Sequence, residues 1–238
     1  MNPLAKIEES FQKGVLPKKE YSLILKRFPL VVSGINRIEK ASGVNFPIAY
    51  VEPSVTMSSS NANSFEYGIL FARTIPITTA NNELKIIIQL SAPLVVFGLS
   101  GTIEGVMAHE FLHYIEYVRK FERLDIISDE ISSTLFEAKY ADACRSFKPE
   151  LIFTHSNKSP QILKHLREKF QNHSVGERLI KKTKEDWINK SLPVRRVSLE
   201  NNVSSIPIET IMKTRFDLDI GRTIKELEQN AKKSKPKR

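Results

Sequence analysis

The sequence predicts an α+β fold in which N-terminal helices are followed by a small mixed sheet and then by further helices. Two observations indicate this fold. Helical patterns dominate the first forty residues, and three runs rich in β-branched and aromatic residues follow before residue 91. The 238 residues could form one large domain, or one domain with an appendage, and either would bury a substantial core.

The first forty residues are expected to form helices. Pro3 and Pro29 suit helix starts, because a first helical turn leaves its N–H groups unpaired and proline has none. Gly43 is placed to end the second of these helices. Apolar residues recur at helical spacing before this glycine, at Val31, Ile35 and Ile38.

Three β-type runs follow these helices. They are FPIAYVE from Phe46, FEYGILFAR from Phe65 and LKIIIQL from Leu84. The stretch TMSSSNANS, residues 56–64, lies between the first two runs and is predicted to be a polar loop. The third run is expected to be a buried strand that leads into a loop.

An uncharged stretch of eighteen residues, 86–103, is just long enough to cross a bilayer as a helix. Gln89, Pro93 and Gly98 interrupt it, which favours a strand followed by a loop. We therefore expect no membrane span. The alternative, a membrane-attached protein, predicts that the chain sediments with lipid.

A helix is predicted from about residue 100 to Phe121. Ser100 or Thr102 is a candidate N-cap, and Glu104 in the first turn suits the helix dipole. Its apolar residues lie almost all round, so the helix should be buried. Polar residues inside such a helix need partners that offset their desolvation, and here they are His109, Glu110 and His113.

A second helix is predicted over residues 126–147. A short connection packs two helices antiparallel, and a chain reversal near Leu124 would set Glu137 opposite Phe111, midway between the two histidines.

The segment MAHEFLHYIEY, residues 107–117, suggests a metal site. Histidines four residues apart leave the same side of a helix, so His109 and His113 can share one ion. A catalytic zinc takes three protein ligands and leaves one position for water, and Glu110 beside the first histidine can act as general base. Glu137 is the favoured third ligand, since it lies on the facing helix. Further candidates for this ligand are Glu130, His155, His165 and His173.

The HExxH helix, the strand before it and the glutamate-bearing helix after it resemble the gluzincin group of zinc metallopeptidases, in particular the small single-domain members. The resemblance covers about residues 45–147. It implies a metalloendopeptidase-like hydrolase that cleaves peptide or protein substrates, with His109, His113 and Glu137 as Zn²⁺ ligands and Glu110 as the catalytic base. It also implies that the strand at residues 84–90 lines the cleft and pairs with an extended substrate.

Two further features belong to such a site. Families of this kind often carry an aspartate four residues after the ligand glutamate; here Ala141 takes that place and Asp142 follows it. A donor for the oxyanion is also required. The candidates are Tyr117, Tyr140 and His155.

Charge divides the chain near Phe147. Residues 1–147 hold 15 Lys and Arg against 16 Asp and Glu, a net charge of −1, whereas residues 148–238 hold 21 against 11, a net charge of +10. We therefore expect a metallopeptidase-like domain at 1–147 and a basic, mainly helical C-terminal extension at 148–238 that ends in a disordered tail.

The basic extension could contact nucleic acid nonspecifically. An alternative function is therefore a nucleic-acid-associated binding protein with a structural metal site. Arg195 and Arg196 are candidates to anchor a substrate.

Cys144 is the single cysteine, which excludes an intrachain disulfide. A reducing compartment fits best, and the N-terminal stretch lacks a secretory signal, so a cytoplasmic location is expected.

Overall fold

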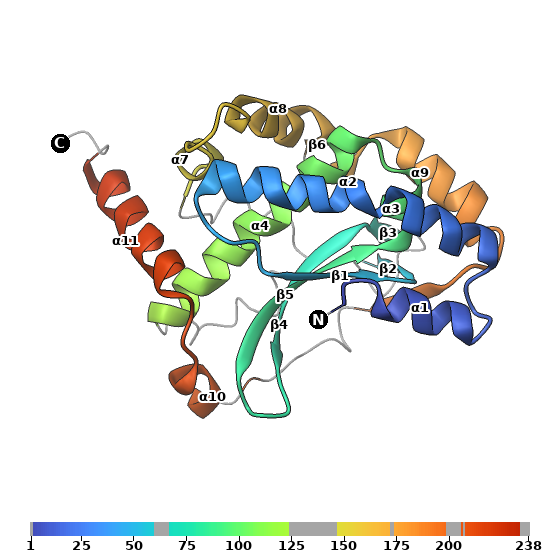
Figure 1. Cartoon of the computed structure of the whole chain (residues 1–238), viewed down its shortest axis with the longest axis horizontal. Helices are drawn as coiled ribbons and strands as arrows, with labels where there is room; N and C mark the ends of the chain where they lie inside the picture. Colours follow the sequence, from blue (N-terminus) through green and yellow to red (C-terminus); the bar gives the residue numbers. More distant parts are fainter. Residues whose placement is uncertain are drawn as a thin grey trace.

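The computed structural model describes residues 2–59, 67–123, 147–171, 174–198, 206 and 208–233. Within these residues the fold is α+β, as predicted. Two long helices, α2 (Lys18–Ser42) and α4 (Ser100–Arg123), pack against each other and lie over a small sheet (Figure 1). The predicted helix at 126–147, with Glu130 and Glu137, falls almost wholly outside the described residues.

The sheet beneath α4 has three described strands. Its central strand β5 (Leu84–Ser91) pairs in parallel with β1 (Ile48–Glu52) and antiparallel with β4 (Ala72–Thr78). Strand β4 pairs with residues 84–90 of β5 and β1 covers residues 87–91, so residues 87–90 have no free edge, and the prediction that residues 84–90 pair with a substrate is wrong for that part. Among the described strands β4 forms the outer edge, where Pro76 is tolerated because its missing N–H breaks no ladder bond.

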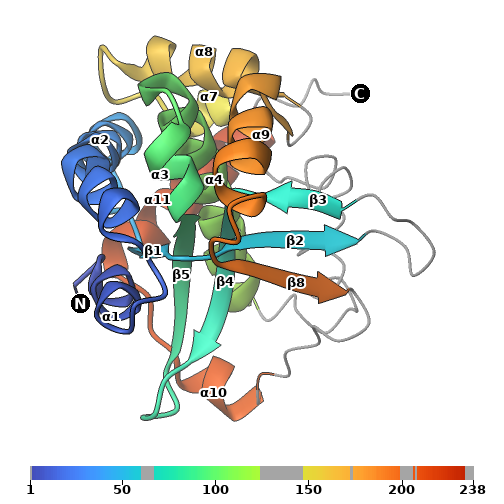
Figure 2. The ribbon, with the colours of Figure 1, turned by 90° about the vertical axis from the view of Figure 1, so that its right-hand side faces the viewer.

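A second sheet has β2 (Val55–Ser59) at its centre, antiparallel to β3 (Tyr67–Leu70) and parallel to β8 (Val194–Ser198). Figure 2 shows these strands running across the direction of β4 and β5. Residues 56–59, predicted as loop, are therefore strand. The run from Phe65 divides at Phe71, because β3 and β4 belong to different sheets.

The N-terminal helices are α1 (Ala5–Gln12) and α2. Gly43 ends α2 in the left-handed conformation, at φ 69°, as predicted. Pro29 lies inside α2, so the prediction that a helix starts there is wrong. An interior proline costs about 3 kcal/mol, yet α2 buries an apolar stripe on both sides of it, and tertiary packing outweighs the local cost. The stripe comprises Ile24, Val31 and Ile38.

Helix α8 (Ser159–Lys169) crosses α4 closely. A Cβ atom added to Gly105 would lie 2.9 Å from the carbonyl oxygen of His165, and one added to Gly101 would lie 2.9 Å from His165 Nε2. Gly105 therefore permits the close approach, since a side chain there would meet the backbone of α8, whereas one at Gly101 would displace the His165 ring.

Most of the remaining C-terminal part is helical. It comprises α7 (Pro149–Ile152), the two-residue strands β6 (Phe170–Gln171) and β7 (Ser174–Val175), α9 (Glu177–Thr183), the π-helical turn η1 (Lys184–Ile188), α10 (Ile208–Lys213) and α11 (Leu218–Lys233). Phe153, Ile162 and Trp187 are buried in the same core cluster as Phe111. The parts before and after residue 147 therefore pack together, although their charges differ.

Among the described residues, no helix combines the length and the apolar character needed to cross a bilayer. The uncharged stretch 86–103 is shared among β5, the short helix α3 (Ala92–Phe97) and the start of α4. Most of its side chains are buried in the core. Burial within the protein thus accounts for its apolar character.

Candidate metal centre

Helix α4 brings His109 and His113 together. Their Nε2 atoms lie 2.9 Å apart, and the ring centroids are separated by 4.6 Å with the planes at 79°. This arrangement follows from the sequence, because residues four apart are one turn apart on the same side of a helix. The predicted histidine pair is therefore formed.

The spacing of the two nitrogens suits a shared ion. Ligand nitrogens about 2.0–2.1 Å from a tetrahedral zinc lie about 3.3 Å apart, so a small rotation of either ring would meet that geometry. The same spacing also suits a hydrogen bond between a protonated and an unprotonated imidazole nitrogen. His109 is only 4% exposed, which makes either form of pairing important, since a buried imidazole needs a partner.

Glu110 is held from strand β4. Thr74 Oγ1 donates to Glu110 Oε2 at 2.8 Å and also lies 2.9 Å from the backbone oxygen of Glu110. Both residues are buried. The threonine hydroxyl therefore fixes the direction of the carboxylate next to the histidine pair, because one of its oxygens is tied to the sheet.

The sequence did not identify Thr74 as a site residue. A weak signal was present, since Thr74 and Pro76 alternate with residues of the opposite face and are the buried members of this strand. A polar residue at a core-facing position requires a partner. Nothing local indicates that Glu110, thirty-six residues later, is that partner.

Phe170 is a second residue that the sequence did not identify. Its ring lies 4.6 Å from the ring of His109 at 67°, an edge-to-face contact. Phe170 stands where α8 passes into β6, so the C-terminal part of the chain forms one wall around the histidine pair.

No third metal ligand stands within the described part of the chain, where no group of three or more His, Cys, Asp and Glu residues could hold an ion. Glu137, Glu130 and His173 lie outside the described residues.

His155 and His165 are described, and neither joins the pair. His155 is exposed, and its ring lies beside Gly43, the C-cap of α2. The suggestion that either histidine completes the metal site is therefore wrong.

His165 instead belongs to a separate cluster around Glu104. His165 Nδ1 lies 2.5 Å from Glu104 Oε2, and Arg37 Nε donates to Glu104 Oε1. Glu104 is 1% exposed, so two partners from α2 and α8 compensate for burying its charge. The sequence predicted only that the charge of Glu104 interacts favourably with the helix dipole. It did not predict the pairing with Arg37 and His165, because these residues are distant in the sequence.

The predicted oxyanion donors are dispersed. Tyr117 is buried one turn after His113, and its ring stacks on Phe121 with centroids 6.1 Å apart. His155 lies beside Gly43, as described above, and Tyr140 falls outside the described residues. Tyr117 is thus the candidate nearest to the histidine pair along the described part of α4.

The basic C-terminal part contains both paired and clustered cations. Lys190 and Lys182 donate to Asp186 at 2.6 and 3.1 Å, and these hydrogen bonds lower the pKa of Asp186. Arg195 on β8 lies near Arg73 on β4. Burial, aided by the charge of Arg195, lowers the pKa of Arg73. Part of the positive charge is therefore neutralised locally, and part gathers where the two sheets meet.

Comparisons of the chain with protein-family models, with curated proteins and with solved structures found no match. The function must therefore be inferred from the motif and from the geometry around His109, Glu110 and His113.

Proposed function

We propose that this protein is a zinc-dependent hydrolase of peptide bonds, with its catalytic centre on α4. The observation that carries the proposal is the convergence of His109 Nε2 and His113 Nε2, 2.9 Å apart, beside a carboxylate that Thr74 orients. Two imidazoles at this spacing form two of the metal ligands of HExxH hydrolases, and the glutamate after the first is their general base. The peptide substrate class comes from the resemblance to gluzincins.

Glu110 would act as the general base. Its carboxylate accepts a proton from the attacking water and later returns it to the leaving amine. Thr74 supports this role as a positioning residue, because its hydroxyl holds Oε2 at 2.8 Å and restricts rotation of the carboxylate. Zinc, when bound, supplies the positive charge that acidifies the water and polarises the scissile carbonyl.

Glu137 remains the proposed third ligand. Catalytic zinc sites combine two histidines with one carboxylate or a third histidine. His155 and His165 are engaged elsewhere, which leaves carboxylates of the region after α4 as the favoured source. Replacing Glu137 with Ala should then lower zinc affinity, whereas Glu130→Ala should not.

The first test is the metal content of the full chain. We expect one zinc per chain by elemental analysis, and its loss in a His109→Ala/His113→Ala variant. His155→Ala is the matched control, since this histidine is exposed and lies beside Gly43 rather than in the pair. Retention of zinc in the double variant would refute the site.

The second test is hydrolysis of a mixture of internally quenched fluorescent peptides. The wild-type chain should cleave members of the mixture, and Glu110→Gln should reduce cleavage by about 10³-fold or more while zinc remains bound. Equal cleavage by Glu110→Gln would remove Glu110 from the mechanism.

The net charge of +10 on residues 148–238 favours a second candidate, a nucleic-acid-associated protein whose metal is structural. This candidate predicts binding of duplex DNA or RNA that weakens steeply with salt and is unchanged in Glu110→Gln. Absence of peptide cleavage together with such binding would favour it.

A further inference from the structure

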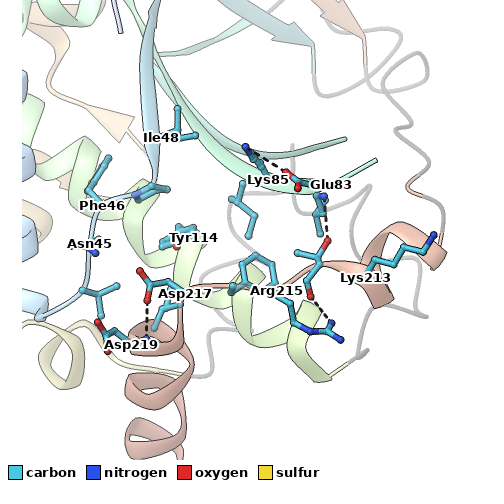
Figure 3. A pocket seen from close by; sticks show the side chains of 17 residues that line it. Asn45, Phe46, Ile48, Glu83, Lys85, Tyr114, Lys213, Arg215, Asp217 and Asp219 are labelled. Carbon is cyan, nitrogen blue, oxygen red and sulfur yellow. Dashed lines mark hydrogen bonds and ion pairs between the residues drawn. The ribbon is translucent and has the colours of Figure 1, made fainter. Parts of the chain in front are cut away.

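A cavity of about 630 Å³ lies on another side of α4 (Figure 3). It is bounded by the segment that leads into β1, by the start of β5, by Tyr114 of α4 and by the connection from α10 to α11. Sites for small molecules commonly occupy about 300–1,000 Å³. The cavity is therefore large enough for a ligand such as a dipeptide.

The cavity is built by an anchored connection between α10 and α11. The backbone N–H of Leu84 donates to Thr214 Oγ1 at 3.2 Å, and Thr214 Oγ1 donates to the carbonyl oxygen of Thr210 at 2.7 Å. Asp217 Oδ1 accepts from the backbone N–H of Asp219 at 3.0 Å. These bonds hold the connection in place, so the cavity is preformed.

The inner wall of the cavity is apolar. Leu84, Ile86 and Ile220 are buried at 5% exposure or less. Phe46 and Phe216 are half-buried and contribute aromatic surface. Such a wall binds aliphatic or aromatic groups, because removing their apolar surface from water is favourable.

The charged residues are arranged asymmetrically. In Figure 3, Asp217 and Asp219 lie at the left with Asn45 and Phe46, whereas Arg215 and Lys213 lie at the right, below Glu83 and Lys85. The carboxylates and cations of the lining are equal in number. A ligand with one positive and one negative end therefore matches the cavity better than a ligand with a net charge.

Tyr114 and Asp217 form the acidic end. Tyr114 projects into the cavity near Asp217 in Figure 3. Asp217 lines the cavity and is exposed, and its Oδ1 accepts a backbone N–H, that of Asp219, so its carboxylate retains capacity to accept from a ligand. A carboxylate beside an aromatic ring is a suitable partner for an ammonium group, which gains a charged hydrogen bond and a cation–π contact.

We propose that this cavity binds the free amino end of a short apolar peptide, with the ammonium group at Asp217 and Tyr114. The first apolar side chain of the peptide lies against Leu84 and Ile86. The C-terminal carboxylate of the peptide points toward the basic end of the cavity, where Arg215 lies. The site is independent of the proposed catalytic function, because none of the residues that form it belongs to the histidine pair, Glu110 or Thr74.

Binding is tested by calorimetric titration of the full chain carrying Glu110→Gln, which prevents turnover of the probe. The probe is the dipeptide Leu-Phe with both ends free. We expect saturable binding of one dipeptide per chain, at least tenfold weaker binding of N-acetyl-Leu-Phe, and about fivefold weaker binding of Leu-Phe amide. Equal affinity for the acetylated probe would overturn the proposal.

Asp217→Asn is the decisive variant. Its amide oxygen can still accept the Asp219 N–H, so the start of α11 is preserved while the negative charge is removed. We expect at least tenfold weaker binding of Leu-Phe. Glu226→Gln, an exposed carboxylate on the same helix outside the cavity, is the matched control and should change affinity less than twofold.

A chelator separates this site from the catalytic centre. Binding of Leu-Phe should be unchanged after zinc is removed. Binding that is lost with the chelator, or that is equal in Asp217→Asn and Glu226→Gln, would place the dipeptide elsewhere and refute the cavity site.

Discussion

Two glutamates of α4, Glu104 and Glu110, lie less than two turns apart, and each belongs to a cluster with histidine. The contacts of the two clusters differ. In one, the buried carboxylate of Glu104 is shared between Arg37 and His165. In the other, the imidazoles of His109 and His113 face each other, and the carboxylate of Glu110 takes a hydroxyl donor from Thr74. The comparison shows how one helix can use the same residue types for structure and for chemistry.

The difference lies in what each carboxylate faces. Two cationic or imidazole donors bind the oxygens of Glu104 and tie α2 and α8 to α4, so this glutamate joins helices. The hydroxyl of Thr74, a neutral donor, fixes the direction of the Glu110 carboxylate. A general base needs such positioning, because the carboxylate must face the proton that it accepts.

The largest expected effect is on turnover. Glu110→Gln should reduce peptide hydrolysis by about 10³-fold or more, in the range of a lost general base, and should change the free energy of unfolding by less than about 1 kcal/mol. Initial rates on a cleaved fluorogenic peptide and urea denaturation measure the two effects. A stability loss as large as that of the next variant would assign Glu110 a structural role.

The second effect is on stability. Glu104→Ala should lower the free energy of unfolding by about 3 kcal/mol, because it leaves Arg37 and His165 without their shared carboxylate. Glu122→Gln, an exposed glutamate of the same helix, is the control and should change stability by less than about 0.5 kcal/mol. Zinc content should be equal in both variants. Equal stability of the two would contradict the structural role of Glu104.

A smaller effect is expected at Thr74. Thr74→Val keeps the shape of the side chain but removes the hydroxyl, so turnover should fall about tenfold, the equivalent of one hydrogen bond to a charged group. Thr74→Ser retains the hydroxyl and should restore most of the rate. Steady-state kinetics should place the loss in kcat rather than KM. Failure of serine to rescue would assign the effect to packing.

The smallest effect concerns Tyr114, another titratable side chain of α4. Burial, aided by the charge of Asp217, raises the pKa of Tyr114 to about 12. The folded state therefore keeps its proton where the unfolded state loses it, and the resulting stability is complete below about pH 10 and lost as pH rises toward 12. The difference between wild type and Tyr114→Phe in unfolding free energy should shrink by about 1 kcal/mol between pH 9 and 11. A difference independent of pH would contradict the shifted pKa.

The sequence predicted features that depend on neighbouring residues. The histidine pair follows from a four-residue spacing on one helix, and the end of α2 follows from Gly43. The positions of β1 and β5 follow from compact apolar runs.

Features that depend on distant residues could not be predicted in this way. The apolar run at residues 84–90 predicts a substrate-binding edge through the gluzincin resemblance, but the place of β5 between β1 and β4 depends on the pairing order of the sheet. Thr74 and Phe170 reach the site from 36 and 61 residues away from their partners Glu110 and His109. Helix α2 likewise continues through Pro29 because of tertiary packing, which local helix propensity does not predict.

The parallel pairing of β2 with β8 joins Val55 to Val194. During synthesis on the ribosome, the second sheet therefore cannot be completed until nearly the whole described chain has emerged. The wall that Phe170 forms against His109 also comes late, after α4 has been made. A nascent chain therefore lacks this wall beside its histidine pair from the synthesis of His113 until Phe170 has emerged.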